Sequence, residues 1–275
     1  MNKFKVFFTV IAFVWLWSCG FWAIFQCLYT GNIAWIGLLI NAWGLPLWML
    51  LRFLSPYKYR GDQREPVAFA AVLAGLAVAL LSDSEKGMPV YLAIYNLFIV
   101  LIYLFHLSAL RHPDSPDVDS LFPPMKMVNG ESWHSADACR RGDFEGLLLV
   151  FLRGSFCADS RAQLLDLAQL LPELERRQIG LVIFSTEPLG NWSHWTKDLP
   201  GVMFVQLASG SGENPVVVAS GGSPLALCAH VSRAARPSQW LLDRDGFVLW
   251  RHLPGNYRTP GDIGLLRGQL FRLQD

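Results

Sequence analysis

Long apolar stretches separated by short polar ones make up the first 110 residues of the chain. From Val6 to Leu51 there is no Asp, Glu, Lys or Arg, and only Thr30-Gly31-Asn32 interrupts the run. A bilayer core about 30 Å thick is crossed by roughly 20 residues at a rise of 1.5 Å per residue. The pattern therefore predicts four membrane-spanning helices, at residues 6–29, 34–54, 66–82 and 88–110.

The third of these segments, 66–82, is the weakest candidate because it is the shortest. Its Ala, Val, Leu and Gly residues are of the kind that lets helices pack closely in lipid. Lys3 and Lys5 before the first apolar run also resemble a signal peptide, but the run continues beyond the 7–15 residues of a signal h-region. We expect residues 1–110 to form an all-α transmembrane bundle of about four helices.

The pattern changes after residue 110. Residues 111–130 contain four Pro and three Asp without an apolar period, which is typical of a linker. We place the linker at 111–125 and a second domain at 126–275. In that domain, continuous apolar runs at 146–152 and 179–184 predict buried parallel strands, and leucines at helical spacing predict a helix over 157–177.

The rest of the second domain continues the alternation. We expect a short helix at 191–199, a strand at 202–207, a hairpin around Arg244-Asp245-Gly246 and a closing helix at 260–273. The Gly- and Ser-rich stretch 208–223 is either a loop or a loose hairpin. Strand, helix, strand, helix, hairpin and helix is the order of a thioredoxin-like α/β domain.

Charge distinguishes the two regions. Residues 1–110 carry seven Lys or Arg and four Asp or Glu, whereas residues 111–275 carry sixteen and eighteen. The overall net charge of +1 provides no basic field for nucleic-acid phosphates, so we expect no nucleic-acid partner. The lipid bilayer is the partner that the N-terminal region predicts.

Basic residues in the short loops predict the orientation. The first loop has none and the third has only Lys86, whereas the second loop carries Arg52, Lys58, Arg60 and Arg64. Because loops rich in Lys and Arg stay on the cytoplasmic side, the N-terminus and the second loop are predicted to lie inside. An even number of spans returns the C-terminal domain to the cytoplasm.

The candidate chemistry lies at Cys157. This cysteine falls between a buried strand and the first turn of a helix, where unpaired N–H groups and the helix dipole favour a thiolate. Arg153 and Arg161 act in the same direction, and Asp159 opposes them. The five cysteines include no closely spaced pair of the kind that binds zinc, so we expect no metal and no cofactor.

The segment LVFLRGSFCADSRAQLLDL resembles the strand-to-helix segment of thioredoxin-fold redoxins of the AhpC/TSA (peroxiredoxin-like) family. More narrowly, it resembles bacterial peroxiredoxin-like proteins with an N-terminal membrane region. RPSQWLLDRDG and Asn256-Tyr257-Arg258 match two further segments, and the resemblance covers about residues 120–275. It implies a location in the bacterial inner membrane and a cis-Pro237 against the reactive sulfur.

The departures from the family bear on the activity. The second cysteine of the family's Cys-Pro-x-Cys is Ser160 here, and Gly154 stands where ordinary peroxiredoxins have Thr or Ser. The resemblance thus implies a single-cysteine cycle completed by an external thiol or a partner redox protein. Cys228 and then Cys139 are the internal candidates for a resolving thiol.

Two functions follow from this pattern. The first is a membrane-tethered, thiol-dependent redox protein in which Cys157 reduces a peroxide or a disulfide. The alternative is a degenerate redoxin without turnover that acts as a membrane-anchored binding or assembly module. The reactivity of Cys157 distinguishes the two.

Overall fold

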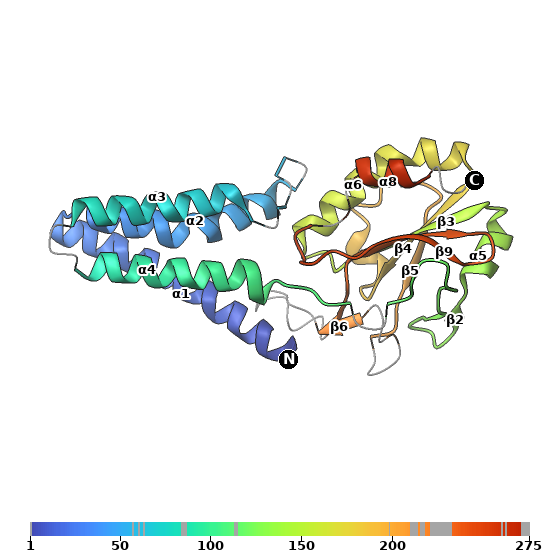
Figure 1. Cartoon of the computed structure of the whole chain (residues 1–275), viewed down its shortest axis with the longest axis horizontal. Helices are drawn as coiled ribbons and strands as arrows, with labels where there is room; N and C mark the ends of the chain where they lie inside the picture. Colours follow the sequence, from blue (N-terminus) through green and yellow to red (C-terminus); the bar gives the residue numbers. More distant parts are fainter. Residues whose placement is uncertain are drawn as a thin grey trace. The chain divides into compact units, whose positions relative to one another are not determined.

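The computed structural model divides the chain into two compact units, Lys3–Ala109 and Leu110–Asp275 (Figure 1). Each unit is described by itself. The structure describes residues 2–56, 58–59, 61–62, 64–83, 87–112, 115–197, 199–209, 214, 218–220, 233–259, 261 and 263–270.

The N-terminal unit is helical. Its helices in the described residues are α1 (Asn2–Thr30), α2 (Ala34–Leu54), α3 (Pro66–Ser82) and α4 (Met88–Ile102), and α4 continues as a π-helical turn, η1 (Tyr103–Leu107). Each predicted span corresponds to a helix. Three stretches are long and apolar enough to cross a membrane, Phe7–Thr30, Ala34–Leu54 and Met88–Leu107, whereas α3 is shorter.

Glycines bring α2 and α3 into close contact along their length (Figure 1). A Cβ atom on Gly37 would lie 2.4 Å from the backbone nitrogen of Ala79, and one on Gly75 would lie 2.4 Å from that of Asn41. Both distances are shorter than any real Cβ contact, so the two helix backbones approach only because these residues lack side chains. Small residues serve the same purpose in helix pairs within lipid.

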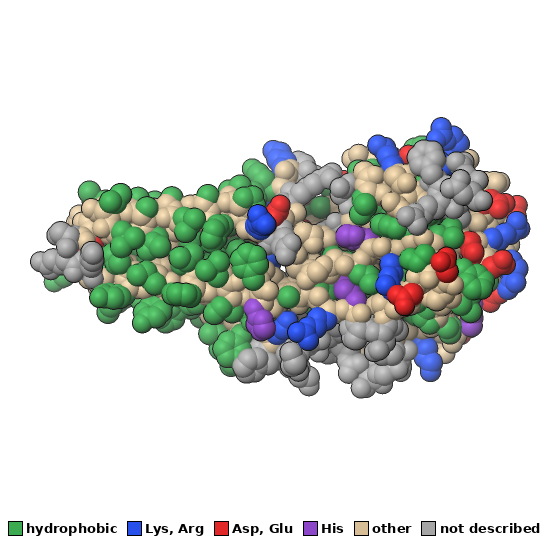
Figure 2. Space-filling model, in the orientation of Figure 1, with side chains coloured by type: hydrophobic (Ala, Val, Ile, Leu, Met, Phe, Trp, Pro, Cys, Tyr) green, Lys and Arg blue, Asp and Glu red, His purple; other side chains and the backbone are tan. Residues whose placement is uncertain are grey.

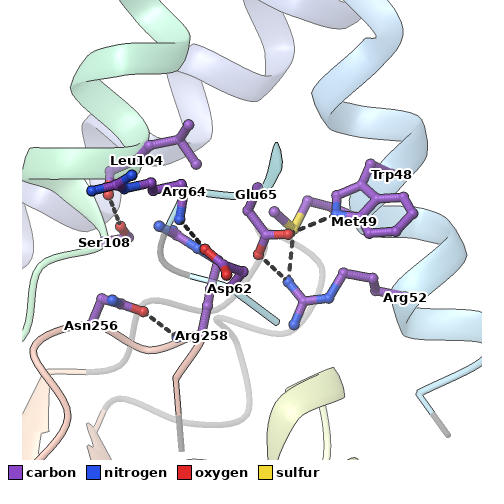
Figure 3. A network of polar contacts seen from close by, with 10 residues as sticks. All are labelled: Trp48, Met49, Arg52, Asp62, Arg64, Glu65, Leu104, Ser108, Asn256 and Arg258. Carbon is purple, nitrogen blue, oxygen red and sulfur yellow. Dashed lines mark hydrogen bonds and ion pairs between the residues drawn. The ribbon is translucent and has the colours of Figure 1, made fainter. Parts of the chain in front are cut away.

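A buried ion pair joins the end of α2 to the start of α3 (Figure 3). Arg52 and Glu65 are 2% and 1% exposed, and the Trp48 indole N–H donates to the second carboxylate oxygen of Glu65 at 2.7 Å. The loop assignment of Arg52 is thus corrected: this residue belongs to the last turn of α2. Its charge can be buried there because Glu65 neutralises it.

The C-terminal unit is built on a five-stranded sheet in the described residues, in the order β5-β4-β3-β8-β9. Its strands are β3 (Gly146–Phe151), β4 (Ile179–Ser185), β5 (Met203–Gln206), β8 (Ser238–Asp243) and β9 (Val248–His252). β3, β4 and β5 are parallel, and β8 and β9 are antiparallel to their neighbours. This is the thioredoxin-like order predicted from the alternation of elements.

Alternate residues of the central strand enter different layers, as the period of two requires. Leu148 and Val150 pack with the leucines of α6 (Ala158–Arg176) and with Leu266 of α8 (Ile263–Gln269). Leu147, Leu149 and Phe151 face the other layer, which includes α5 (Ser135–Gly142). The central strand is therefore buried on both sides, which explains its continuous apolar sequence.

Smaller elements complete the unit. These are β1 (Met125–Lys126), β2 (Ser132–Trp133), β6 (Val218–Ser220), β7 (Arg233–Ala235) and the 3-10 helix η2 (Leu189–Trp192). β6 pairs antiparallel with β7, which lies after the Gly- and Ser-rich stretch 208–223. Most of that stretch lies outside the described residues, so the choice between a loop and a loose hairpin stays open. The helix predicted at 191–199 is wrong: only η2 and turns occur in its described residues.

The segment predicted to be a linker packs along the C-terminal sheet. The backbone N–H groups of Leu110, Asp119 and Phe122 donate to carbonyls of residues 255, 248 and 246. The Arg251 side chain binds Asp117 and the carbonyls of residues 115 and 116. The compact unit therefore begins at Leu110 rather than at residue 126, because hydrogen bonds to the hairpin hold a chain that has no apolar period of its own.

Candidate functional site

Cys157 lies in the turn between β3 and α6, where it is the N-cap residue of the helix. Its backbone N–H donates to the Gly154 carbonyl at 3.0 Å, and its own carbonyl accepts from the Arg161 N–H at 3.2 Å. The side chain is 7% exposed and clusters with Phe156 and Ala234. The sulfur is thus held at the positive end of a 19-residue helix.

Gly154 makes this turn sterically feasible. A Cβ atom at this position would lie 2.3 Å from the ring of Phe156. The absence of a side chain allows that ring to fold back over the turn and pack beside Cys157.

The peptide unit of Ser155 is held from two sides. Its N–H donates to the Oε2 atom of Glu187 at 2.7 Å, and its carbonyl accepts from the Nε atom of Arg161. Glu187 is buried just beyond the end of β4, where its own N–H donates to the Ser185 hydroxyl. Two oppositely charged side chains therefore fix the backbone that precedes Cys157.

Arg161 connects these groups electrostatically. Burial lowers the pKa of its guanidinium, while the charges of Cys157 and Glu187 raise it. The guanidinium also lies over the Trp195 ring, with its carbon 4.9 Å from the ring centroid. Arg161 thus interacts electrostatically with both Cys157 and Glu187.

Arg153 occupies a different environment. Its guanidinium lies 3.8 Å from the centroid of the Tyr257 ring and 5.5 Å from that of Phe156. Its backbone N–H donates to the hydroxyl of Ser160 at 3.1 Å. The Ser160 hydroxyl therefore binds the backbone just after β3, while the Arg153 guanidinium stacks on aromatic rings.

Pro237 lies at the same edge of the sheet as Cys157, because the next residue, Ser238, pairs with Phe151 at the end of β3. The prediction of a cis bond at Pro237 is wrong: the residues that the structure describes, Arg236 and Pro237 among them, contain no cis peptide bond. The distance in sequence from Pro237 to Asp243 correctly predicts that Pro237 lies directly before β8. Whether the bond between Arg236 and Pro237 is cis or trans depends on the local backbone, which this spacing does not specify.

Cys139 is far from this turn. Its sulfur lies 3.8 Å from the carbonyl oxygen of Asp243, which pairs with Gly146 at the opposite end of β3. A strand of this length separates the two ends by roughly 16 Å at 3.3 Å per residue. Burial, with a further contribution from Asp243, raises the pKa of the Cys139 thiol to about 11. Cys228, the other predicted resolving thiol, lies outside the described residues.

The structure adds residues to the site that the sequence analysis did not select: Glu187, Trp195 and Tyr257. A signal for Glu187 was present, because it follows a buried parallel strand and the carboxyl ends of such strands meet at one edge. Tyr257 belongs to the segment Asn256-Tyr257-Arg258, which carries part of the family resemblance, whereas Trp195 had no such signal. Within the described part of the chain, no three His, Cys, Asp or Glu side chains form a group that could hold a metal ion.

Comparisons with known proteins find similarity among solved structures alone. No family model matches the chain, and no curated protein does. A mutant of peroxiredoxin 6 of Arenicola marina is 16% identical, with 58% of this chain and 73% of that chain covered and a TM-score of 0.43. Peroxidoxin BcpB from Mycobacterium tuberculosis is 12% identical, with 58% and 96% covered and a TM-score of 0.41.

A peroxiredoxin-like protein from Aquifex aeolicus is 7% identical, with 60% of this chain and 92% of that chain covered and a TM-score of 0.44. Each of these TM-scores is below 0.5, so the likeness assigns neither a family nor an activity to this chain. The structure itself gives an N-terminal helical unit followed by an α/β unit built on a five-stranded sheet in the described residues.

Proposed function

We propose that this chain is a membrane-anchored thiol redox protein in which Cys157 is the nucleophile that reduces a peroxide or a disulfide. The observation that carries the proposal is the placement of Cys157 at the N-cap of α6 with Arg161 within Coulombic reach. Helix N–H groups and a guanidinium both favour the thiolate, which is the reactive form of cysteine.

The reaction with a peroxide proceeds through an oxidised sulfur. The thiolate attacks one peroxide oxygen, the O–O bond breaks, and the other oxygen leaves as an alcohol or water after taking up a proton. Cys157 becomes a sulfenic acid. An external thiol displaces water to form a mixed disulfide, and a second thiol releases reduced Cys157 together with the disulfide of the reductant.

The reductant that we propose is a small external thiol or a partner redox protein. Ser160 stands at the position of a local partner cysteine and binds the Arg153 backbone. Cys139 lies at the far end of β3 and has a raised pKa. Cys228 lies outside the described residues, so the proposal rests on Ser160 and Cys139.

The helical unit provides the anchor. Figure 2 shows hydrophobic side chains over its surface, while charged side chains gather on the C-terminal unit. Large apolar side chains on α1, such as Phe21, Phe25 and Leu28, are more than half exposed. Lipid is the environment in which such a surface is stable. We include α3 as a fourth span because it packs closely on α2.

One observation favours the alternative, a binding module without turnover. Cys157 is only 7% exposed in the reduced chain, so a substrate must enter a nearly closed turn. In the alternative, the same buried turn would serve a structural purpose, and the domain would hold a partner protein at the membrane.

Alkylation of the full chain in detergent tests the proposal. We expect iodoacetamide at pH 8 to modify Cys157 faster than Cys139, whose thiolate fraction at a pKa of about 11 is roughly one in a thousand. Cys157→Ser should abolish peroxide consumption with dithiothreitol as reductant, whereas the control Cys139→Ser should retain it. A Cys157 that stays unmodified in the folded chain would contradict the redox function and favour the binding module.

A further inference from the structure

The interior of the N-terminal unit contains two apolar clusters separated along the helix axes. On each of the four helices, the nearest buried members of the two clusters are seven residues apart: Leu16 and Ala23, Leu38 and Leu45, Val72 and Ala79, and Ala93 and Val100. Seven residues are two helical turns, or about 10.5 Å. One further layer of side chains therefore fits between the clusters.

That layer is polar. Each helix contributes one residue midway between its two cluster members: Cys19, Asn41, Gly75 and Asn96. Both asparagine side chains are fully buried. Asn41 lies seven residues after the start of α2 and Asn96 eight residues after the start of α4, and these two helices are in contact. The two amides thus lie at the same level of the bundle.

Each amide already makes one hydrogen bond to another helix. The Nδ2 group of Asn41 donates to the Val72 carbonyl of α3 at 2.8 Å. The Oδ1 atom of Asn96 accepts from the Trp15 indole of α1 at 2.9 Å. These partners fix the orientation of both amides, because a carbonyl only accepts and an indole N–H only donates.

The remaining atom of each amide has no hydrogen-bond partner among the described residues: Oδ1 of Asn41, which is an acceptor, and Nδ2 of Asn96, which is a donor. An unsatisfied polar group in an apolar interior is unfavourable. One acceptor and one donor at the same level form a complementary pair, although the two do not bond directly.

We infer that Asn41 and Asn96 form a binding site for a single water molecule in the middle of the helix bundle. The water donates to Oδ1 of Asn41 and accepts from Nδ2 of Asn96. Buried waters usually make about three hydrogen bonds, and the Cys19 thiol of the same layer is a further weak partner.

The site would complete a network across the bundle. One existing bond joins α1 to α4 and the other joins α2 to α3. A bridging water links these two helix pairs through Asn96 and Asn41. This inference uses only side chains of the N-terminal unit and is independent of any reaction at Cys157.

Nuclear Overhauser contacts between water and asparagine side chains test the site. The full chain, labelled with 15N-asparagine, is studied in detergent micelles. We expect the Asn96 Nδ2 protons to show a cross-peak to a long-lived water, and Asn41→Leu should remove it. Asn32, in the turn between α1 and α2, is the internal control because its side chain is exposed to bulk water, although its Oδ1 atom also accepts from the Ala34 N–H.

Leu81→Val, at an exposed position of α3, is the control variant, because it leaves both amides and their hydrogen-bond partners in place. The water cross-peak should persist in this variant. Unfolding equilibria of Asn41→Leu, Asn96→Leu and the double variant should depart from additivity by about threefold, as interhelical hydrogen bonds in membrane proteins do. Absence of the cross-peak from the folded wild-type chain, or its survival in Asn41→Leu, would overturn the water site.

Discussion

Ser155 contributes to the candidate site through its backbone. Its N–H donates to Glu187 and its carbonyl accepts from Arg161, so the backbone of one residue lies between two oppositely charged side chains. Burial lowers the pKa of the Arg161 guanidinium, and the negative charges of Cys157 and Glu187 oppose this effect. Glu187 and Cys157 therefore interact with the same positive charge.

Substitutions at Glu187 separate its charge from its hydrogen bond. Glu187→Gln keeps an oxygen that accepts from the Ser155 N–H but removes the negative charge. We expect alkylation of Cys157 at pH 7 to become several-fold faster, because the carboxylate no longer competes with the thiolate for the Arg161 guanidinium. Glu187→Ala also removes the acceptor, and the free energy of unfolding should fall by about 1–3 kcal/mol.

The exposed Glu175 on α6 provides the control, since Glu175→Gln removes an equal charge far from the turn's hydrogen bonds. Its alkylation rate and denaturant midpoint should match those of the wild type. Slower alkylation in Glu187→Gln would mean that the carboxylate serves mainly to hold Arg161 in place.

At the scale of elements, the contact between α2 and α3 depends on two glycines rather than on large apolar side chains. The backbone of each helix occupies the space in which the other helix's Cβ atom would lie. The ion pair of Arg52 and Glu65 closes the same pair of helices at one end. Close backbone contact and a paired charge together hold α3, a helix of 17 residues, against its neighbour.

Gly75→Val tests this contact. The new side chain would collide with the backbone of α2 near Asn41, and relief of such overpacking costs about 1–3 kcal/mol or more. We expect Gly75→Val to lower the midpoint of thermal unfolding of the helical unit, measured in detergent by circular dichroism. Leu73→Val, at an exposed position of the same helix, should change the midpoint little. Equal midpoints for the two variants would contradict the close approach.

The segment after α4 is a second element whose role depends on its contacts. The ring of His112 lies 3.0 Å from the Pro254 carbonyl, which attaches the segment near the end of the hairpin. Burial lowers the pKa of His112, the hydrogen bond to Pro254 opposes this effect, and the charges of Arg236 and His252 add to the lowering.

This lowered pKa predicts a pH dependence of stability. An unfolded histidine titrates near pH 6.5, so below that pH the unfolded chain takes up a proton that folded His112 resists. The contribution of His112 to the free energy of unfolding is fully present above about pH 6.5. It is lost as the pH falls towards the lower pKa that His112 has in the folded chain. Denaturant midpoints of the C-terminal unit should decrease over this range, and His112→Gln should weaken the decrease. His134→Gln, at an exposed position, should leave it unchanged.

At the scale of the whole molecule, the chain combines a helical unit covered by apolar side chains with an α/β unit that carries most of the charge (Figure 2). The basic residues Lys58, Arg60 and Arg64 lie between α2 and α3 in the sequence. The burial of Arg52 does not alter the asymmetry between the loops, because the first loop has no basic residue and the third has only one.

Reporter fusions test the resulting topology. Four spans with a cytoplasmic N-terminus predict that fusions after Arg64, after Lys86 and after Arg111 lie inside, outside and inside. An outside reading after Arg111 would imply an odd number of spans. It would place the C-terminal unit in an oxidising compartment, where an external thiol reductant is scarce.

The sequence by itself determined those features that depend on local period and composition. The apolar runs of the first 110 residues predicted α1, α2, α3 and α4. The apolar runs at 146–152 and 179–184 predicted β3 and β4 to within one residue at each end. The position of Cys157 at the start of α6 followed from the strand and helix that flank it. Each of these features is a property of neighbouring residues, which is why a linear pattern suffices.

Contacts between distant residues were decided only by the tertiary structure. No local pattern predicts the contact of Ser155 with Glu187 or that of Arg153 with Tyr257. Nor does a local pattern predict that Asn41 and Asn96 are both fully buried. The same holds for the docking of residues 110–122. Their composition is typical of a linker, but in the folded unit their backbone is hydrogen-bonded to the hairpin and the residues after it. Polar side chains bind whichever groups lie nearby once the helices and strands have packed. Packing brings together residues that are far apart in the sequence, and nothing in the sequence between them indicates that they will meet.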